Sequence, residues 1–130
     1  RAMAADSELS DSVHSAIGRN PNAPVELQWR VAAHDSPYMR VDVADNPGAA
    51  GEVLLRLAND VDRTVRCIAA GNPSLPVEGL IKCTDDADRE IRSAVARNPS
   101  TPREIRLALL HDADPLVRVS AALGILKASL

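Results

Sequence analysis

Residues 91–105 read IRSAVARNPSTPREI, and the pair Asn98-Pro99 at the centre of this stretch recurs along the chain. The same pair stands at Asn20-Pro21, Asn46-Pro47 and Asn72-Pro73, each 26 residues from the next. A fixed period of roughly 20–50 residues is typical of a solenoid, in which each repeat covers the apolar face of its neighbour. The sequence therefore predicts a repeat architecture.

The residues before each Asn-Pro pair have the spacing of a short helix. In the third copy, Val65, Ala69 and Ala70 stand at i, i+4 and i+5, which places them on one helical face. The proline forces the preceding asparagine out of the helical region, so this segment, the Val-Arg helix, ends there after about two turns. Its start is marked in the five copies by residues that favour N-caps, namely Ser10, Ser36, Asp62, Asp88 and Asp114.

A second short helix is expected after each pair. The segment Thr101-Pro102-Arg103-Glu104 predicts a capping box, with Pro102 at the first helical position. We call this segment the Pro-Glu helix, and it leads into an acidic turn such as Asp86-Ala87-Asp88. The glutamate column of these helices, explained by capping and by the helix dipole, consists of Glu26, Glu52, Glu78 and Glu104.

Helices of about two turns are not stable alone in water, so they must be stabilised by stacking on neighbouring repeats. The chain is therefore predicted to be an all-α α-solenoid of short paired helices, with a 26-residue period and about 4.5 repeats. Residues 1–8 are predicted to be an N-terminal tail, and residues 9–130 a single helical-repeat domain. In the fifth copy Gly124-Ile125 replaces the Asn-Pro pair, so residues 115–130 are expected to continue as one longer helix.

The repeat resembles the leucine-rich repeat variant (LRV) family of bacterial proteins. The resemblance rests on Val-Arg-x-x-x-Ala-x-Asn-Pro, as in residues 65–73, followed by Ser-x-Pro-x-Glu and an acidic turn. It implies a HEAT-like, armadillo-like right-handed superhelix that alternates α-helices with 3₁₀ or very short α-helices. Some members carry an N-terminal cysteine cluster for an iron–sulfur centre. This sequence has only Cys67 and Cys83, so no cofactor is expected.

An arginine column is the first candidate site. Two interpretations stay open: a basic stripe that contacts phosphate or an acidic partner, or a structural ladder in which each arginine pairs with an aspartate of a nearby turn. The column consists of Arg40, Arg66, Arg92 and Arg118, with His14 at the matching position of the first copy.

A cluster of variable residues is the second candidate site. Trp29 and Arg30 precede, and Tyr38 and Arg40 follow, the turn between the first Pro-Glu helix and the second Val-Arg helix. Because other copies have Leu55, Ile81 or Leu107 at the position of Trp29, one interpretation is that the tryptophan replaces a core residue. An exposed Trp–Tyr–Arg cluster would instead be typical of an interaction hot spot.

Composition narrows the function further. The net charge of −3 argues mildly against a nonspecific binder of nucleic acid, and no apolar run is long enough for a transmembrane helix. The histidines are dispersed, without metal-ligand spacing or a nucleophile–base pattern, so no catalytic residue or metal site is expected. The two cysteines are too few for a disulfide framework and favour a reducing, cytoplasmic location.

We therefore interpret the chain as a non-enzymatic scaffold for protein–protein interaction. One alternative is binding of an anion or a nucleic acid through the arginine column. The other is a structural segment of a larger multidomain protein. The expected partner is another protein, with nucleic acid less favoured, and the residues proposed to contact it are Trp29, Arg30, Tyr38, Arg40, Arg66, Arg92 and Arg118.

Overall fold

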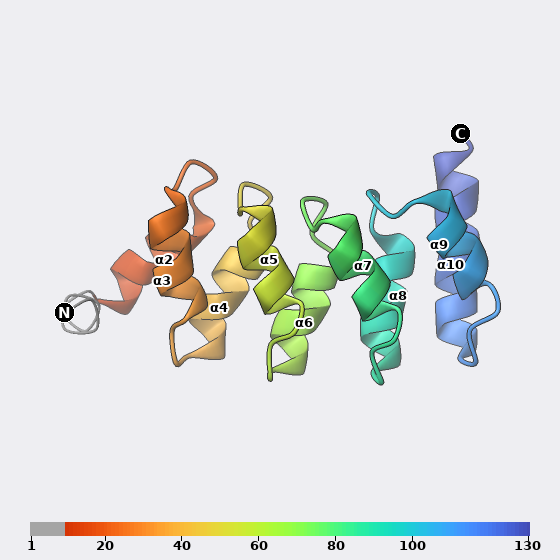
Figure 1. The fold of residues 1–130 in the computed structure, drawn as a ribbon, viewed down its shortest axis with the longest axis horizontal. Helices are drawn as coiled ribbons and strands as arrows, with labels where there is room; N and C mark the ends of the chain where they lie inside the picture. Colours follow the sequence, from red (N-terminus) through yellow and green to blue (C-terminus); the bar gives the residue numbers. More distant parts are fainter. Residues whose placement is uncertain (1–9) are drawn as a thin grey trace.

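A computed structural model describes residues 10–130 of the chain (Figure 1). The tail predicted over residues 1–8 lies outside the described residues, as does Leu9. The described residues form nine helices and no strand, which confirms the all-α prediction. In chain order they are α2 (Asp11–Arg19), α3 (Val25–Ala32), α4 (Pro37–Ala44), α5 (Gly51–Leu57), α6 (Arg63–Ala70), α7 (Val77–Cys83), α8 (Arg89–Arg97), α9 (Arg103–Leu109) and α10 (Pro115–Ala128).

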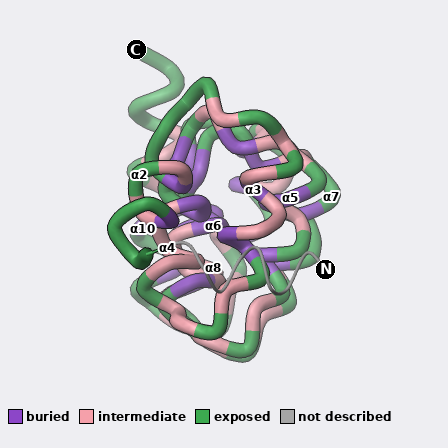
Figure 2. The backbone as a smooth tube through the Cα atoms, turned by 90° about the vertical axis from the view of Figure 1, so that its left-hand side faces the viewer, coloured by how far each residue is buried: buried purple, intermediate pink, exposed green. Residues whose placement is uncertain are grey.

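The helices form two layers, one from each half of the repeat. The even-numbered Val-Arg helices pack side by side from α2 to α10, and the odd-numbered Pro-Glu helices form the second layer. Within the odd-numbered layer, α7 and α9 pack less closely than the other neighbours. Figure 2 looks along the stack and shows buried backbone between the layers and exposed backbone outside them. This arrangement is the predicted solenoid.

Small aliphatic residues fill the core between the layers. Val65, Ile91 and Val117 occupy one repeat position, and none of them has exposed area. Val95 and its equivalents Val43, Ala69 and Ala121 are likewise fully buried, whereas Ile17 in the first copy is partly buried. Close packing of short helices explains why the core needs no phenylalanine, since small side chains let neighbouring helices approach each other.

The two kinds of helix begin in different ways. The Val-Arg helices have the predicted side-chain caps, as at Asp62, which accepts hydrogen bonds from the backbone N–H groups of Thr64 and Val65. The predicted capping box at Thr101 is wrong. Its hydroxyl donates 2.6 Å to the carbonyl of Val95, and Pro102 is the N-cap of α9 without a side-chain bond. The Pro-Glu helices are α-helices of seven or eight residues, so the α/α alternative holds.

The asparagine of each Asn-Pro pair joins successive repeats. The Asn72 amide nitrogen donates to the carbonyl of Ala44 at 2.8 Å and to that of Asn46 at 2.9 Å, both in the preceding repeat. Its side-chain oxygen accepts the backbone N–H of Ser74 and closes the turn. Asn46 and Asn98 make equivalent bonds, and all three asparagines are at most 3% exposed. We call this series the asparagine ladder.

The ladder ends at α10. This helix runs unbroken for 14 residues, which confirms the longer helix expected from Gly124-Ile125. The next rung would need an asparagine at position 124, but Arg106 donates instead to the carbonyl of Asn98 at 2.8 Å. A Cβ atom on Gly124 would lie 2.6 Å from the carbonyl oxygen of Ala96, so only glycine fits beside this carbonyl. The outer face of α10 exposes Leu123 and Leu126.

Candidate functional site

The arginine column forms a second ladder between repeats. The Arg40 guanidinium contacts Asp60 through two N–H groups, at 2.8 and 3.0 Å. It also donates to the carbonyls of His34 and Asp35 at 2.8 and 3.0 Å. Arg92 repeats this arrangement with Asp112, and Arg66 does so with Asp86 through a single N–H group, each aspartate lying twenty residues later. The predicted Arg–Asp pairing is therefore present, and we call it the arginine ladder.

The arginine ladder already uses guanidinium N–H groups that a bound phosphate would need as hydrogen-bond donors. Asp112 is half-buried, which opposes its ionisation, but hydrogen bonds from Arg92 and from the N–H of Asp114 lower its pKa on balance. The same bond from Asp112 raises the pKa of Arg92. Arg118 makes the two carbonyl contacts, to Asp112 and Ala113, with no carboxylate contact among the described residues.

A histidine pair takes the place of the first rung. His14 stands at the arginine position and His34 at the aspartate position, and their ring centroids lie 5.0 Å apart in an edge-to-face arrangement. His34 Nδ1 accepts the N–H of Ser36, just as Asp60 Oδ1 accepts the N–H of Asp62. His34 therefore closes the turn in the same way as the aspartates of later repeats.

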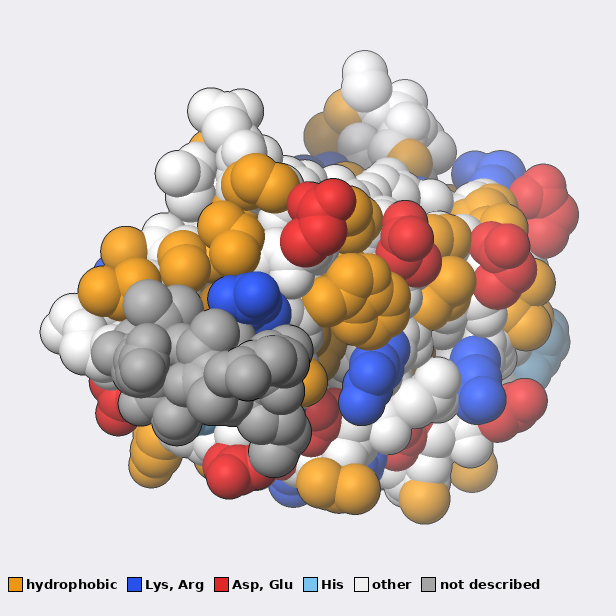
Figure 3. All heavy atoms as spheres, turned by 60° about the vertical axis from the view of Figure 1, so that its left-hand side comes forward, with side chains coloured by type: hydrophobic (Ala, Val, Ile, Leu, Met, Phe, Trp, Pro, Cys, Tyr) orange, Lys and Arg blue, Asp and Glu red, His pale blue; other side chains and the backbone are white. Residues whose placement is uncertain are grey.

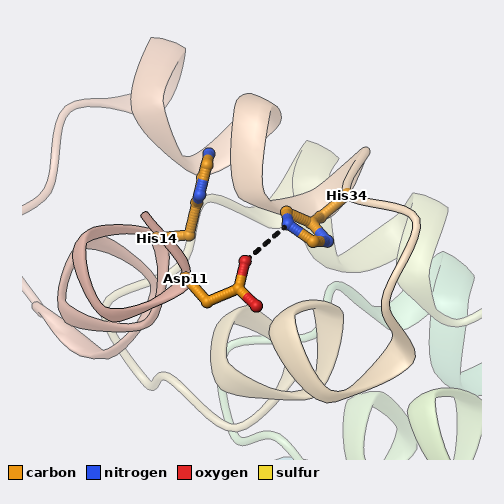
Figure 4. A group of neighbouring side chains, drawn as sticks. All are labelled: Asp11, His14 and His34. Carbon is orange, nitrogen blue, oxygen red and sulfur yellow. Dashed lines mark ion pairs between the residues drawn. The ribbon is translucent and has the colours of Figure 1, made fainter. Parts of the chain in front are cut away.

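These histidines and Asp11 are the group in residues 10–130 whose ligand atoms lie close enough to hold a metal, within 4.8 Å of one another (Figure 4). The hydrogen bond from Ser36, however, leaves the proton of neutral His34 on Nε2. That nitrogen faces Asp11 Oδ1 at 3.6 Å, so it presents an N–H rather than a lone pair. A metal bound at Nε2 would require the ring proton to move to Nδ1, which would break the hydrogen bond from Ser36. We therefore assign these three residues a structural role in the packing of the first two repeats.

The predicted Trp29 cluster is divided between two helices. Trp29 on α3 is half-buried and packs against the core, with the Arg56 guanidinium 5.8 Å from its ring centroid. Arg30 is half-buried beside it. Tyr38 on α4 is 80% exposed, and Arg40 belongs to the arginine ladder. Trp29 thus combines the core role with a position at the edge of the odd-numbered layer.

The outer surface of the odd-numbered layer is the candidate site that the structure reveals. Each helix of this layer has a glutamate in its first turn and an apolar residue three positions later. In α3, α5 and α7 a basic residue directly follows the apolar one. Because the helices lie side by side, these residues form three bands across them (Figure 3). We call this surface the banded face, and its bands are Glu26, Glu52, Glu78 and Glu104; Trp29, Leu55, Ile81 and Leu107; and Arg30, Arg56 and Lys82.

The apolar band is more exposed toward the C-terminal repeats. Trp29 and Leu55 are half-buried, whereas Ile81 is 53% exposed and Leu107 is 41% exposed. The sequence showed the glutamate column, which we interpreted only as capping. Aligning the four copies and comparing the two positions that follow three and four residues after each glutamate could have revealed the apolar and basic bands.

Three clefts lie between successive repeats near the C-terminal ends of these helices, and the first two have matching linings. The third shares some of these repeat positions but extends toward the apolar band, where Ile81 and Ile105 line it. Arg56 lines the cleft between α3 and α5, and Lys82 lines the one between α5 and α7. Ala108 stands at the corresponding position of α9. The cleft between α7 and α9 has a volume of about 380 Å³ and no lysine or arginine in its lining.

The environments of the two cysteine thiols do not activate them as nucleophiles. Cys67 is half-buried and Cys83 is buried, and both are free. Burial raises the pKa of Cys83 to about 11 and also raises the pKa of Cys67. A thiol is nucleophilic as its thiolate, so neither side chain is activated at neutral pH.

Comparison with known proteins adds one finding on the family. The family described as leucine rich repeat variant matches residues 89–114, which contain α8, α9 and the turn after α9. This confirms the expected family for that unit, whose 26-residue spacing the other units share. A comparison with curated proteins finds no match. None of the helices between residues 10 and 130 has both the length and the apolar character needed to cross a membrane.

Proposed function

We propose that this array of leucine rich variant repeats is a non-enzymatic scaffold that binds another protein on the banded face. The observation that carries this proposal is that some repeat positions bond neighbouring repeats to each other, whereas others leave their side chains exposed. The asparagine and arginine ladders use their polar groups to hold repeats together. The banded face leaves Ile81 and Leu107 exposed beside the glutamate band, and Ile81 is flanked on its other side by Lys82 of the basic band.

The chemistry of the banded face suits a protein partner. Interfaces are favoured by aromatic and aliphatic anchors surrounded by polar groups, and Trp29, Ile81 and Leu107 supply such anchors. The flanking glutamates and basic residues would select a partner with complementary charges and set its orientation. Free thiols at Cys67 and Cys83 are compatible with the reducing, cytoplasmic location that we propose.

The arginine column is a weaker candidate for binding nucleic acid. Arg40, Arg66 and Arg92 each contact an aspartate and two carbonyl groups, so a phosphate would have to compete with these contacts. Glutamates also line the banded face and would repel a polyanion. A role as a structural segment of a larger protein is compatible with the scaffold, because the banded face would then bind a neighbouring domain.

Partner capture with matched surface variants tests the proposal. The tagged chain is used to isolate a binding protein from its native source, and the affinity is then measured with both purified proteins. We expect the double variant Ile81→Glu and Leu107→Glu to weaken binding at least tenfold, since it places charges in the apolar band.

The control is the double variant Val61→Glu and Val119→Glu, which alters two exposed aliphatic residues outside the banded face. It should bind like the unmodified chain, and both variants should retain its helical circular dichroism. The proposal fails if the Ile81 and Leu107 variant binds normally, or if only the control variant loses binding.

A further inference from the structure

The cleft between α7 and α9 differs chemically from the two clefts before it. Its apolar walls are Ile81 from α7 and Ile105, Ala108 and Leu109 from α9. Ile81 is 53% exposed, so the cleft opens directly onto the apolar band. The residue that distinguishes it is Ala108, because the equivalent positions carry the long basic side chains of Arg56 and Lys82.

The N-terminal cleft shows what a long side chain does at this position. Arg56 reaches toward the preceding repeat, and its guanidinium lies 5.8 Å from the ring centroid of Trp29. In the cleft between α7 and α9 an alanine cannot reach Ile81, the residue equivalent to Trp29. The looser packing of α7 against α9 keeps this space open, and its volume of about 380 Å³ can admit a large aliphatic side chain.

The charges around this cleft are negative. Glu104 is exposed at the start of α9, and Asp112 lines the opposite end, where the Arg92 guanidinium already binds it. The lining contains no lysine or arginine, and besides the two carboxylates its one titratable side chain is that of His111. Because Asp112 is already bound by Arg92, Glu104 is the carboxylate available to a partner. Charge complementarity therefore favours a cation next to the inserted side chain.

We propose that this cleft, which we call the anchor cleft, binds a leucine- or methionine-sized side chain of a partner polypeptide that carries a lysine or arginine beside it. This inference rests on the proposed function, because it identifies the part of the banded face where the partner's anchor residue binds. The anchor buries its aliphatic atoms against Ile81, Ile105 and Leu109. Its basic neighbour contacts Glu104.

A peptide titration followed by methyl NMR tests the anchor cleft on the full chain. The probe is an acetylated, amidated peptide in which one leucine stands between two lysines. We expect saturable shifts of the Ile81, Ile105 and Leu109 methyl signals. Replacing the peptide leucine by alanine should weaken binding roughly tenfold, as expected for the loss of about 1.4 kcal/mol of apolar burial. Replacing both lysines by glutamate should weaken it several-fold.

The decisive variant is Ala108→Arg, which restores the residue type of the first two clefts and should abolish the shifts. Position 108 is exposed and Arg56 is accommodated at the equivalent position, so the variant should fold. Ala108→Lys, which copies Lys82, provides a second closing variant. Val61→Arg adds the same charge at a residue that is 93% exposed and outside this cleft, and it should leave binding unchanged.

The anchor cleft is refuted if the peptide causes no saturable shifts at its walls, or if the shifts persist in both Ala108 variants. It is also refuted if the alanine peptide binds as well as the leucine peptide. The scaffold function has a separate test in the captured partner. A partner that binds the Ala108 variants normally but not the Ile81 and Leu107 variant would support the banded face and exclude the anchor cleft.

Discussion

At the scale of single residues, the asparagines are the polar groups that define the repeat. The buried amide of Asn72 satisfies two carbonyls of the preceding repeat, and one of them, Ala44, is the last residue of α4. Carbonyls at the end of a helix have no partner within the helix, so the asparagine supplies one. The same side chain closes its own turn through Ser74. One residue thus fixes the turn and its register against the neighbouring repeat.

Replacing Asn72 by alanine should therefore destabilise the chain strongly. The change leaves two carbonyls and the N–H of Ser74 without their side-chain partner, so we expect unfolding free energy to fall by about 3 kcal/mol or more. Urea unfolding followed by circular dichroism measures the difference. The control is Asn59→Ala, which removes an exposed side chain whose one hydrogen bond within residues 10–130 is to the carbonyl of Leu55, and it should change stability by less than about 0.5 kcal/mol. Equal losses in the two variants would contradict the asparagine ladder.

The aspartate caps predict a defined response to acid. The hydrogen bond from Arg63, assisted by the N–H of Glu90, lowers the pKa of Asp88 from 3.8 to about 2. The unfolded chain binds a proton at the higher pKa, so the stability from Asp88 is complete above about pH 4 and is lost as the pH falls to about 2. Carbon NMR of the Asp88 carboxyl, combined with unfolding across this range, measures both quantities.

Arg63→Ala supplies the control for this titration, because it removes the main cause of the shift. We expect the pKa of Asp88 to move back toward 3.8 and the acid dependence of stability in this range to become shallower. An unchanged pKa of Asp88 in this variant would show that the capped turn, rather than the arginine, holds the carboxylate ionised.

At the scale of elements, α10 shows how the ladder is closed. The Asn98 carbonyl, which would receive an asparagine at position 124, binds Arg106 instead. Helix α10 passes so close to Ala96 that Gly124 has no room for a Cβ atom. Gly124 and Arg106 together let a continuous helix take the place of two short helices and a turn.

A pair of glycine substitutions tests this closure. Gly124→Ala should lower the unfolding free energy by about 1–3 kcal/mol through overpacking against Ala96, although alanine favours helix by roughly 1 kcal/mol. Gly71→Ala is the matched control, since an added Cβ would lie 3.7 Å from the carbonyl oxygen of Ile68 and 3.8 Å from that of Cys67, which is ordinary contact, and its φ of −87° suits alanine. Thermal unfolding compares the two. A Gly124 variant as stable as the Gly71 variant would show that α10 can shift away from Ala96.

At the scale of the whole molecule, the periodicity was sufficient to predict the stack and much of its bonding. Asn-Pro spacing located the turn inside each repeat and the Asp-rich segments the turn between repeats, and the aspartates near Arg66 and Arg92 suggested the arginine ladder as one of two interpretations. The bonds of Asn72 to the preceding repeat were missed, because sequence spacing does not show which carbonyls approach an amide. Thr101 looked like a cap, but burial turned its hydroxyl toward Val95. The banded face required the lateral packing of the odd-numbered helices, which no single repeat reveals.

The assembled chain separates residues that hold repeats together from residues available to a partner. The ladders lie at positions shared by the copies, whereas Trp29, Ile81 and Ala108 occupy columns in which the residue type differs between copies. Variation at such positions changes the surface without disturbing the stack. This is why the banded face, rather than the arginine column, is the surface that we expect a partner to recognise.

Hydroxyl-radical footprinting of the complex with the captured partner tests this central claim most directly, because it reports the exposure of individual side chains. We predict that partner binding protects Trp29, Ile81 and Leu107 from oxidation, while Val119 and Leu123 on α10 react as in the free chain. Protection confined to α10, with Ile81 and Leu107 oxidised equally in the free and bound chains, would contradict the account.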